Sequence, residues 1–360
     1  MKSSLTGFRN PAFRFKPLDN KWGDPIPQQG FATPKSDIVA NVGSLDFSQQ
    51  ATIKGSGDMR ISDRGATPYG RVRVEYVLDP GASFEQSWVI GSFYMSSPST
   101  TFKDGRQFTD VELYDNLLAL HEDSIVEGLA VPEGSDPLAE VSRQMGAASL
   151  YRADVTPTAK RLRTALTFEP GTTRLQVVNA LLAAADYFSL WCNGEGVYQV
   201  KPYTPPRLRP VEWVFKDGES SIVVDDVTVE SSDFNAPNRV LGVSRADGLS
   251  KPLVAVATVT DTSSPFHRNN LGRWRTELLD GGDVDVASQS DLQARVDRRL
   301  AAATTAVRKV VVQHGWVPLQ LNSVAELDLK EVKGRFVVVN QAIPLDPTQL
   351  VTTTLREALE

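Results

Sequence analysis

LTFEPGTTRLQVVNALLAAADYFSLWCNGEGVYQVKPY, residues 166–203, contains the clearest local signals in the chain. It opens with Leu166 and Phe168 in a predicted strand, which a Pro-Gly pair ends. Thr173, with Gln176 three residues later, has the spacing of a helix capping box. Apolar residues then recur at intervals of three or four, so the pattern predicts a helix over 173–187.

The second half of this stretch predicts a β-hairpin. Residues 188–192 and 197–200 are rich in apolar and aromatic side chains, and Asn193-Gly194 between them is a strong turn signal. Upstream, Pro137 to Met145 has the pattern of a short helix. Downstream, four prolines between 202 and 210 mark a boundary. We therefore expect an α/β insertion domain over residues 125–204.

The chain before this insertion predicts β structure. Trp88 to Tyr94 and Phe108 to Leu113 have strand patterns, and closely spaced short strands are typical of a barrel or a small sandwich. We expect a first β-barrel domain over 35–124. Residues 71–78 alternate with period two, which places Val72, Val74, Tyr76 and Leu78 on one face and Arg71, Arg73 and Glu75 on the other.

The chain after the insertion predicts β structure again, with one helix. Ser290 with Gln293 is a second capping-box pattern, and the apolar stripe that follows predicts a helix near 290–305. We expect a second β-rich barrel domain over 205–360, although part of 205–245 could instead complete the first barrel. The predicted fold class is α+β and mainly β, with two β-barrel-like domains and an α/β insertion domain.

Residues 1–34 are predicted to form an extended N-terminal arm, because five prolines interrupt any helix or central strand. Its aromatic side chains are costly to leave in water. Two interpretations stay open: the arm folds back on its own domain, or it lies across a neighbouring subunit. The candidate subunit-interface residues of the arm are Phe8, Phe13, Phe15, Trp22 and Phe31.

Composition limits the class of partner. Lys plus Arg number 38 and Asp plus Glu 44, so the formal charge is 38 − 44 = −6. A clamp on nucleic acid needs a concentrated basic surface, which is missing from the sequence, whereas an acidic surface lets DNA slide past without capture. The single cysteine excludes an intrachain disulfide, and no signal peptide or membrane-length apolar run is present. We expect assembly inside a cell without membrane anchoring.

The sequence offers no catalytic, cofactor-binding or metal-binding residue that we nominate. The histidines His121, His267 and His314 lie far apart and fit no zinc pattern. The Gly- and Asp-rich segment 280–285 lacks the closing Glu of a calcium loop. Cys192 lies in an apolar hairpin, which favours a buried structural thiol over a nucleophile. Whether calcium or a glycan binds stays open.

Residues 166–191 followed by 193–203 resemble a recurrent segment of phage tail hub proteins, in which an extended piece leads into a helix, a short hairpin and an x-Pro-Tyr sequence. Upstream, 88–93 and 108–120 are similar to the first barrel of that family. Downstream, the order of 238–243, 290–303 and 334–339 also fits. The resemblance covers most of residues 70–356 and is to minor tail proteins of long-tailed, siphovirus-like phages of Gram-positive, actinobacterial hosts.

The resemblance implies a structural role without enzymatic activity or cofactors. It implies a baseplate hub subunit at the virion tail tip, a homotrimer that closes the distal end of the tail tube and opens for DNA ejection. The implied partners are a distal tail ring protein, the tape measure protein and other tail-tip or spike proteins, while phage DNA passes through the lumen without specific binding.

Two other classes of function remain as alternatives. A tail-associated enzyme that cleaves peptidoglycan or glycans needs two carboxylates a few ångströms apart in a cleft. A carbohydrate-binding receptor protein needs aromatic residues along a shallow groove. The six tryptophans are scattered along the sequence, so we expect them to fill cores or interfaces instead.

Overall fold

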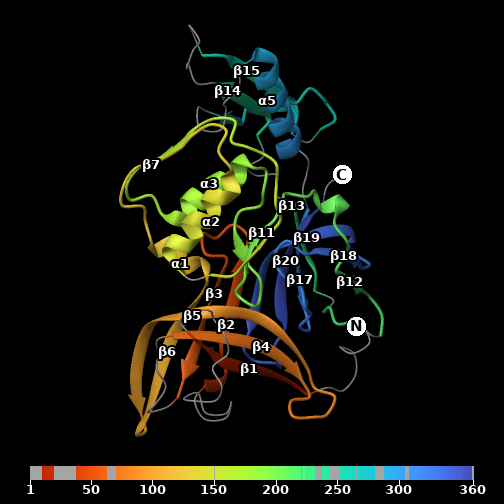
Figure 1. The fold of residues 1–360 in the computed structure, drawn as a ribbon. Helices are drawn as coiled ribbons and strands as arrows, with labels where there is room; N and C mark the ends of the chain where they lie inside the picture. Colours follow the sequence, from red (N-terminus) through yellow and green to blue (C-terminus); the bar gives the residue numbers. More distant parts are fainter. Residues whose placement is uncertain are drawn as a thin grey trace. The chain divides into compact units, whose positions relative to one another are not determined.

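The computed structural model describes residues 10–19, 38–62, 70–149, 151–219, 221–224, 226–231, 237–243, 252–264, 266–279, 288–304 and 308–358. The chain divides into two compact units. Unit 1 comprises residues 1–227 and 312–355, and unit 2 comprises residues 228–311 and 356–360. Figure 1 labels elements of both units where there is room.

The first sheet of unit 1 is antiparallel and follows the order β1-β4-β5-β6-β3-β2. The apolar face that the alternation in 71–78 predicts is indeed buried, and Val72, Val74 and Phe93 have no exposed surface. This core explains why the strands pair as they do, because a one-residue slip would turn every apolar side chain outward. The strands are β1 (Pro11–Leu18), β2 (Ile38–Ser48), β3 (Gly55–Ile61), β4 (Gly70–Leu78), β5 (Gln86–Lys103) and β6 (Arg106–Asp115).

Strand β2 carries the hydrogen-bonded path onward from the first sheet to β19, then to β20 and β17. β18 pairs with β19 on a side branch, and β12 pairs parallel to β18. The bounds of these strands are β12 (Trp213–Lys216), β17 (Arg308–His314), β18 (Val324–Asp328), β19 (Lys333–Pro344) and β20 (Val351–Glu357), and a 3₁₀ turn η2 (Pro206–Leu208) precedes them.

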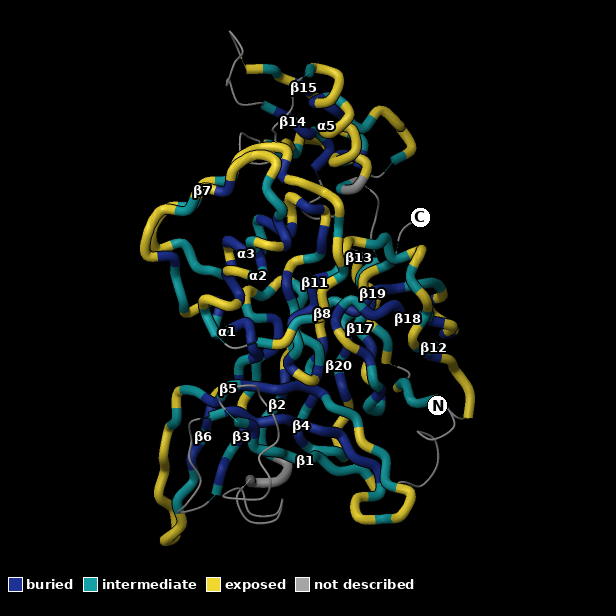
Figure 2. The backbone as a smooth tube through the Cα atoms, in the orientation of Figure 1, coloured by how far each residue is buried: buried dark blue, intermediate teal, exposed yellow. Residues whose placement is uncertain are grey.

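The insertion has a core of its own, built by three helices and two small sheets. α3 has the predicted Thr173–Gln176 capping box, and the predicted hairpin is present as the antiparallel pair β10–β11. Figure 2 shows the buried faces of α2 and α3 in dark blue. The elements are α1 (Leu117–Glu122), β7 (Leu129–Val131), α2 (Pro137–Ala148), β8 (Ala153–Val155), β9 (Leu166–Phe168), α3 (Arg174–Ala184), β10 (Trp191–Cys192) and β11 (Tyr198–Val200).

Unit 2 is a three-stranded sheet with one helix packed on it. The sheet has the order β15-β14-β16, and Leu292 and Val296 of α5 pack against Val240, Ala255 and Ala257. Gly242 leaves room for this helix, because a Cβ there would lie 2.6 Å from a methyl carbon of Val296. The elements are β13 (Thr228–Ser231), which pairs with the 308–311 half of β17, β14 (Arg239–Val243), β15 (Val254–Thr258), α4 (Arg268–Leu271), β16 (Thr276–Leu279) and α5 (Gln289–Thr304).

Two sequence expectations need correction, and one helix was missed. The strands form open paths, and no closed barrel exists among the described residues, because β2 pairs onward with β19 rather than closing on β1. The cap of α5 lies two residues earlier than predicted, since the Ser288 hydroxyl accepts from the Asp291 N–H and donates to its carboxylate. α1 was not predicted, although Asp115 before its first turn accepts the Leu117 N–H.

The mainly β, α+β fold class is confirmed. The division into an arm, two β domains and an insertion at the predicted boundaries stays a prediction. No helix among the described residues is long and apolar enough to span a membrane.

Candidate functional site

The charged face of β4 is buried, although the sequence pattern is typical of a strand with one solvent-exposed face. Arg71, Arg73 and Glu75 are 5%, 8% and 3% exposed. Arg14 and Lys16 of the neighbouring β1 form ion pairs with Glu75, at 3.7 Å and 2.6 Å. Buried charges persist only when they are paired and hydrogen-bonded, so something must cover the two arginines and satisfy them.

The turn that joins β10 to β11, residues 193–196, covers the arginines. Arg73 forms an ion pair with Glu195 at 2.8 Å, and the Ser92 hydroxyl donates to the Gly194 carbonyl at 2.9 Å. These contacts join the insertion to β4 and β5 of the first sheet.

Asn116 adds a second set of contacts from the start of α1. Its side-chain amide donates to the Gly196 carbonyl, and its side-chain oxygen accepts from Arg71, both at 2.6 Å. The Tyr198 hydroxyl donates to the Asn116 backbone carbonyl, also at 2.6 Å. The 193–196 turn is therefore held by a network of polar contacts from Arg71, Arg73, Ser92 and Asn116, in which the buried Nε of Arg71 has no hydrogen-bond partner among the described residues.

The glycines of the turn allow this close approach. A Cβ at Gly194 would lie 2.5 Å from the Val89 carbonyl oxygen, and one at Gly196 would lie 2.7 Å from the Asn116 amide nitrogen. Gly196 also has φ +77°, which disfavours any other residue. β5 has a bulge at this point, because Val74 pairs with Gly91 and Glu75 with Val89, leaving Ile90 as the extra residue.

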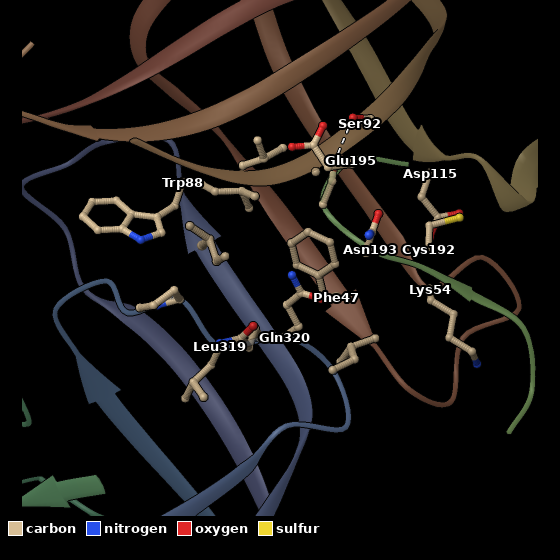
Figure 3. Close-up of a pocket in the computed structure, with 18 of the residues that line it drawn as sticks. Phe47, Lys54, Trp88, Ser92, Asp115, Cys192, Asn193, Glu195, Leu319 and Gln320 are labelled. Carbon is tan, nitrogen blue, oxygen red and sulfur yellow. Dashed lines mark hydrogen bonds between the residues drawn. The ribbon is translucent and has the colours of Figure 1, made fainter. Parts of the chain in front are cut away.

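A cavity of about 380 Å³ lies beside the docked turn. β5, the 191–195 segment and the 316–321 segment line it, together with Phe47, Gln341 and Ile343. Three tryptophans from distant parts of the sequence meet there, Trp88, Trp191 and Trp316. Figure 3 shows Trp88 at one end of the cavity and Asp115 with Cys192 at the other, with Phe47 between them.

The ionisable groups at the far end of the cavity are strongly perturbed. Burial raises the pKa of Asp115 to about 7, against the opposing effects of backbone N–H donors from Leu117 and Gly55 and of the Lys54 charge. Because the folded carboxyl holds its proton more tightly than the unfolded one, the free energy of unfolding falls as pH rises from about 4 to 7. Burial also raises the pKa of the Cys192 thiol, and the Asp115 charge adds to this, which opposes a nucleophilic role.

His314 is perturbed in the other direction. It lies buried with Nδ1 2.6 Å from the Gly315 carbonyl and Nε2 2.8 Å from the Thr353 hydroxyl, so Nδ1 donates and Nε2 accepts. Burial lowers the pKa of His314 to about 4. The stability that the neutral ring contributes is fully present above pH 6.5 and is lost as pH falls from 6.5 towards 4.

The other candidate groups from the sequence do not converge. His121 is exposed at the end of α1, and His267 caps α4 by accepting the Asn269 N–H. Among the described residues, no three or more His, Cys, Asp and Glu side chains are placed to hold a metal ion. The 280–285 segment lies outside the described residues.

The described part of the N-terminal arm belongs to the first sheet. Phe13 and Phe15 lie in β1, in register with Tyr76 and Val74 of β4, and the rings of Phe13 and Tyr76 make an edge contact with centroids 5.7 Å apart. The other three interface candidates, Phe8, Trp22 and Phe31, lie outside the described residues. The role of the arm at a subunit interface stays a prediction.

The chain shares its fold with phage tail proteins. No protein-family model matches the sequence, and no curated protein matches it. The structure is similar to the tail protein from Neisseria meningitidis MC58, with 13% identity and a TM-score of 0.64 over 96% of each chain. It is also similar to the 43 kDa tail protein of prophage MuSo2 from Shewanella oneidensis, with 11% identity and a TM-score of 0.62 over 98% of this chain and 99% of that one.

A third similar structure is a component of the E. coli type VI secretion system, described as structurally similar to the T4 bacteriophage tail proteins gp27 and gp5. It is 8% identical, with a TM-score of 0.51 over 91% of this chain and 75% of that one. At such identities the likeness establishes the fold alone.

Sequence reasoning missed both the docked turn and the cavity. Trp88 and Trp316 come within 5.5 Å although 228 positions separate them, and no local pattern connects them. One signal for the turn was available in the sequence. The three charged residues on one face of β4 indicated that another polar segment could pack against that face.

Proposed function

We propose that this chain is a structural subunit of a phage tail and forms the baseplate hub at the distal end of the tail tube. In this role it closes the tube, links it to tail-tip proteins and opens for DNA passage. The observation that carries the proposal is the fold, which matches two tail proteins, one of them from a prophage, over at least 96% of every chain compared. The type VI component, described as similar to gp27 and gp5, supports the more specific hub role.

The docked 193–196 turn supports a mechanical role. A hub must transmit force between its domains without deforming, and directional polar contacts favour one orientation of packed elements. Opening would then come from relative movement of rigid bodies, driven by contacts made elsewhere in the tail tip. A net charge of −6 is compatible with DNA passing the subunit without specific binding.

The proposed assembly is a homotrimer located at the virion tail tip and put together in the host cytoplasm. Its proposed partners are the distal tail ring protein, the tape measure protein and the other tail-tip or spike proteins. The resemblance noted in the sequence extends the proposal to a siphovirus-like phage of a Gram-positive, actinobacterial host.

Light scattering on the purified chain, alone and mixed with its neighbouring tail proteins, tests this proposal. We expect a trimer, or a monomer that becomes three copies in a ring-shaped complex. A stable monomer that ignores the tail proteins and clears a cell-wall suspension would overturn the hub role and favour a peptidoglycan-cleaving enzyme.

A further inference from the structure

We propose that the cavity lined by β5, the 191–195 segment and the 316–321 segment is a binding site for a neutral saccharide. This inference goes beyond the hub role and does not depend on it. Nothing in the tail-tip proposal requires a small-ligand site, and a saccharide site could exist on a monomer.

The cavity has rigid aromatic walls. Trp316 stacks on Tyr76 with ring centroids 4.3 Å apart, and Trp88 lies 5.5 Å from Trp316 at an interplanar angle of 47°. Trp191 is held by an edge contact with Phe188 at 5.7 Å. Pyranose rings present flat patches of C–H groups, and large, rigid indole surfaces bury such patches at little cost in side-chain entropy.

Hydrogen-bond donors of the cavity are left without protein partners. Among the described residues, nothing accepts from the indole N–H groups of Trp88 and Trp316 or from the side-chain amide N–H groups of Asn193 and Gln320. Trp88, Trp316 and Asn193 are half-buried and Gln320 is exposed, so these groups are accessible. A ring of hydroxyl groups is the ligand chemistry that uses several such donors at once.

The charged groups around the cavity have partners within the protein. Glu195 is paired with Arg73 at 2.8 Å, and the Lys54 ammonium donates to the carbonyls of Gln49 and Ala51 at 2.6 Å and 3.2 Å. Asp115, with its pKa raised to about 7, accepts two backbone N–H groups. Each of these groups thus already has partners within the protein, which favours a neutral ligand over an ion.

Core packing alone is a poor account of this cluster. Protein interiors leave few voids larger than a water molecule. Here a space of about 380 Å³ stays open beside three tryptophans, within the range of sites for small ligands. If the tryptophans served only to fill the core, they would be expected to close this space.

Titration of intrinsic tryptophan fluorescence, together with saturation-transfer NMR, tests the proposal on the full chain. The probes are neutral disaccharides of hexose and of N-acetylhexosamine, with a uronic acid disaccharide as the charged comparison. We expect saturable binding of a neutral disaccharide and weaker binding of the charged one. Preference for N-acetylhexosamine would indicate a cell-wall glycan, and preference for hexose would indicate another surface polysaccharide.

Two variants and one control locate the site. Gln320→Ala removes an exposed amide and is expected to weaken binding about 10-fold, the effect of one or two hydrogen bonds. Trp88→Phe keeps an aromatic ring but loses the indole N–H, and a similar loss is expected. Trp274→Phe is the control, because Trp274 is a partly exposed tryptophan of unit 2 that does not line the cavity.

Absence of saturable binding by every disaccharide would overturn the proposal, as would equal affinity in the wild type and both cavity variants. A third result would also overturn it: no sugar binds, yet both cavity variants lose a contact to a neighbouring tail protein. The cavity would then receive a protein side chain. Circular dichroism spectra of the variants show whether a loss reflects the site or the fold.

Discussion

Gly194 lies against the backbone of β5, so replacing it with alanine tests whether the 193–196 turn fixes the insertion to the first sheet. The added Cβ would lie 2.5 Å from the Val89 carbonyl oxygen, 3.1 Å from the Val89 carbonyl carbon and 3.3 Å from the Ile90 carbonyl oxygen. All three atoms are backbone, so a rotamer change cannot relieve the clash. Gly194 has no positive φ, so the clash is the only strain that the substitution introduces.

The expected loss of stability follows from the contacts that the turn loses when it moves away from β5. Carbon and oxygen need roughly 1 Å more separation than this, so the turn must retreat from β5 by about that amount. A retreat of this size would break the 2.9 Å bond from Ser92 to the Gly194 carbonyl and weaken the ion pair from Arg73 to Glu195. One buried hydrogen bond costs about 1–3 kcal/mol when its partner is left unsatisfied, while the half-exposed ion pair adds less than about 1 kcal/mol. We expect Gly194→Ala to destabilise unit 1 by about 3 kcal/mol.

Urea unfolding followed by far-UV circular dichroism measures the loss, and amide hydrogen exchange shows where it falls. Protection should drop in residues 191–200 before it drops in the first sheet. Gly146→Ala is the matched control, since Gly146 lies in α2 and a Cβ there meets only Tyr151 at an ordinary 3.5 Å. Helix propensity predicts that this control gains about 0.5–1 kcal/mol. If Gly194→Ala unfolds within about 0.5 kcal/mol of the wild type with unchanged protection, the turn does not hold the joint.

Three further predictions concern pH, unit 2 and the arm. In Asp115→Asn only the His314 effect remains, so the free energy of unfolding should rise by about 1 kcal/mol per pH unit between pH 4 and 6.5. In His314→Gln only the Asp115 effect remains, so the free energy of unfolding should fall as pH rises to 7. Flat pH profiles in both variants would contradict the assigned pKa shifts. Gly242→Ala should lower the melting temperature of the unit 2 transition, with a cost of about 1–3 kcal/mol from overpacking against α5, and calorimetry showing an unshifted transition would refute that contact. Phe13→Ala should lower the free energy of unfolding by about 2 kcal/mol, because the contact with Tyr76 is lost, and should leave the oligomeric mass unchanged. A smaller mass by light scattering would show that this part of the arm also bridges subunits.

Local chemistry explains which elements could be predicted. The α3 capping box, the strand alternation in 71–78 and the hairpin around Asn193 depend on residues a few positions apart, and all three are present as predicted. Barrel closure could not be predicted in the same way, because it depends on which strand pairs with the second edge of β2, the edge that does not pair with β3. The strand that pairs there is β19, which lies almost 300 residues further along the sequence. The same limit applies to the cavity, whose walls join β5 to the segment after β17.

The buried charges of β4 explain more about orientation than about stability. Replacing a buried ion pair by well-packed apolar residues is often neutral or stabilising, whereas removing one partner is strongly destabilising. An apolar face on β4 would also hold the insertion, but apolar contacts are non-directional and tolerate several relative positions. The planar guanidinium groups of Arg71 and Arg73 donate only to acceptors placed in line with their N–H groups, here Asn116 and Glu195. Glu195 is half-exposed, so its pair with Arg73 adds less than about 1 kcal/mol. The double variant Arg73→Met with Glu195→Leu should therefore change the stability of unit 1 little, while hydrogen exchange in residues 191–200 becomes faster. A double variant that loses stability but keeps full protection of the turn would show that the pair is a source of stability instead.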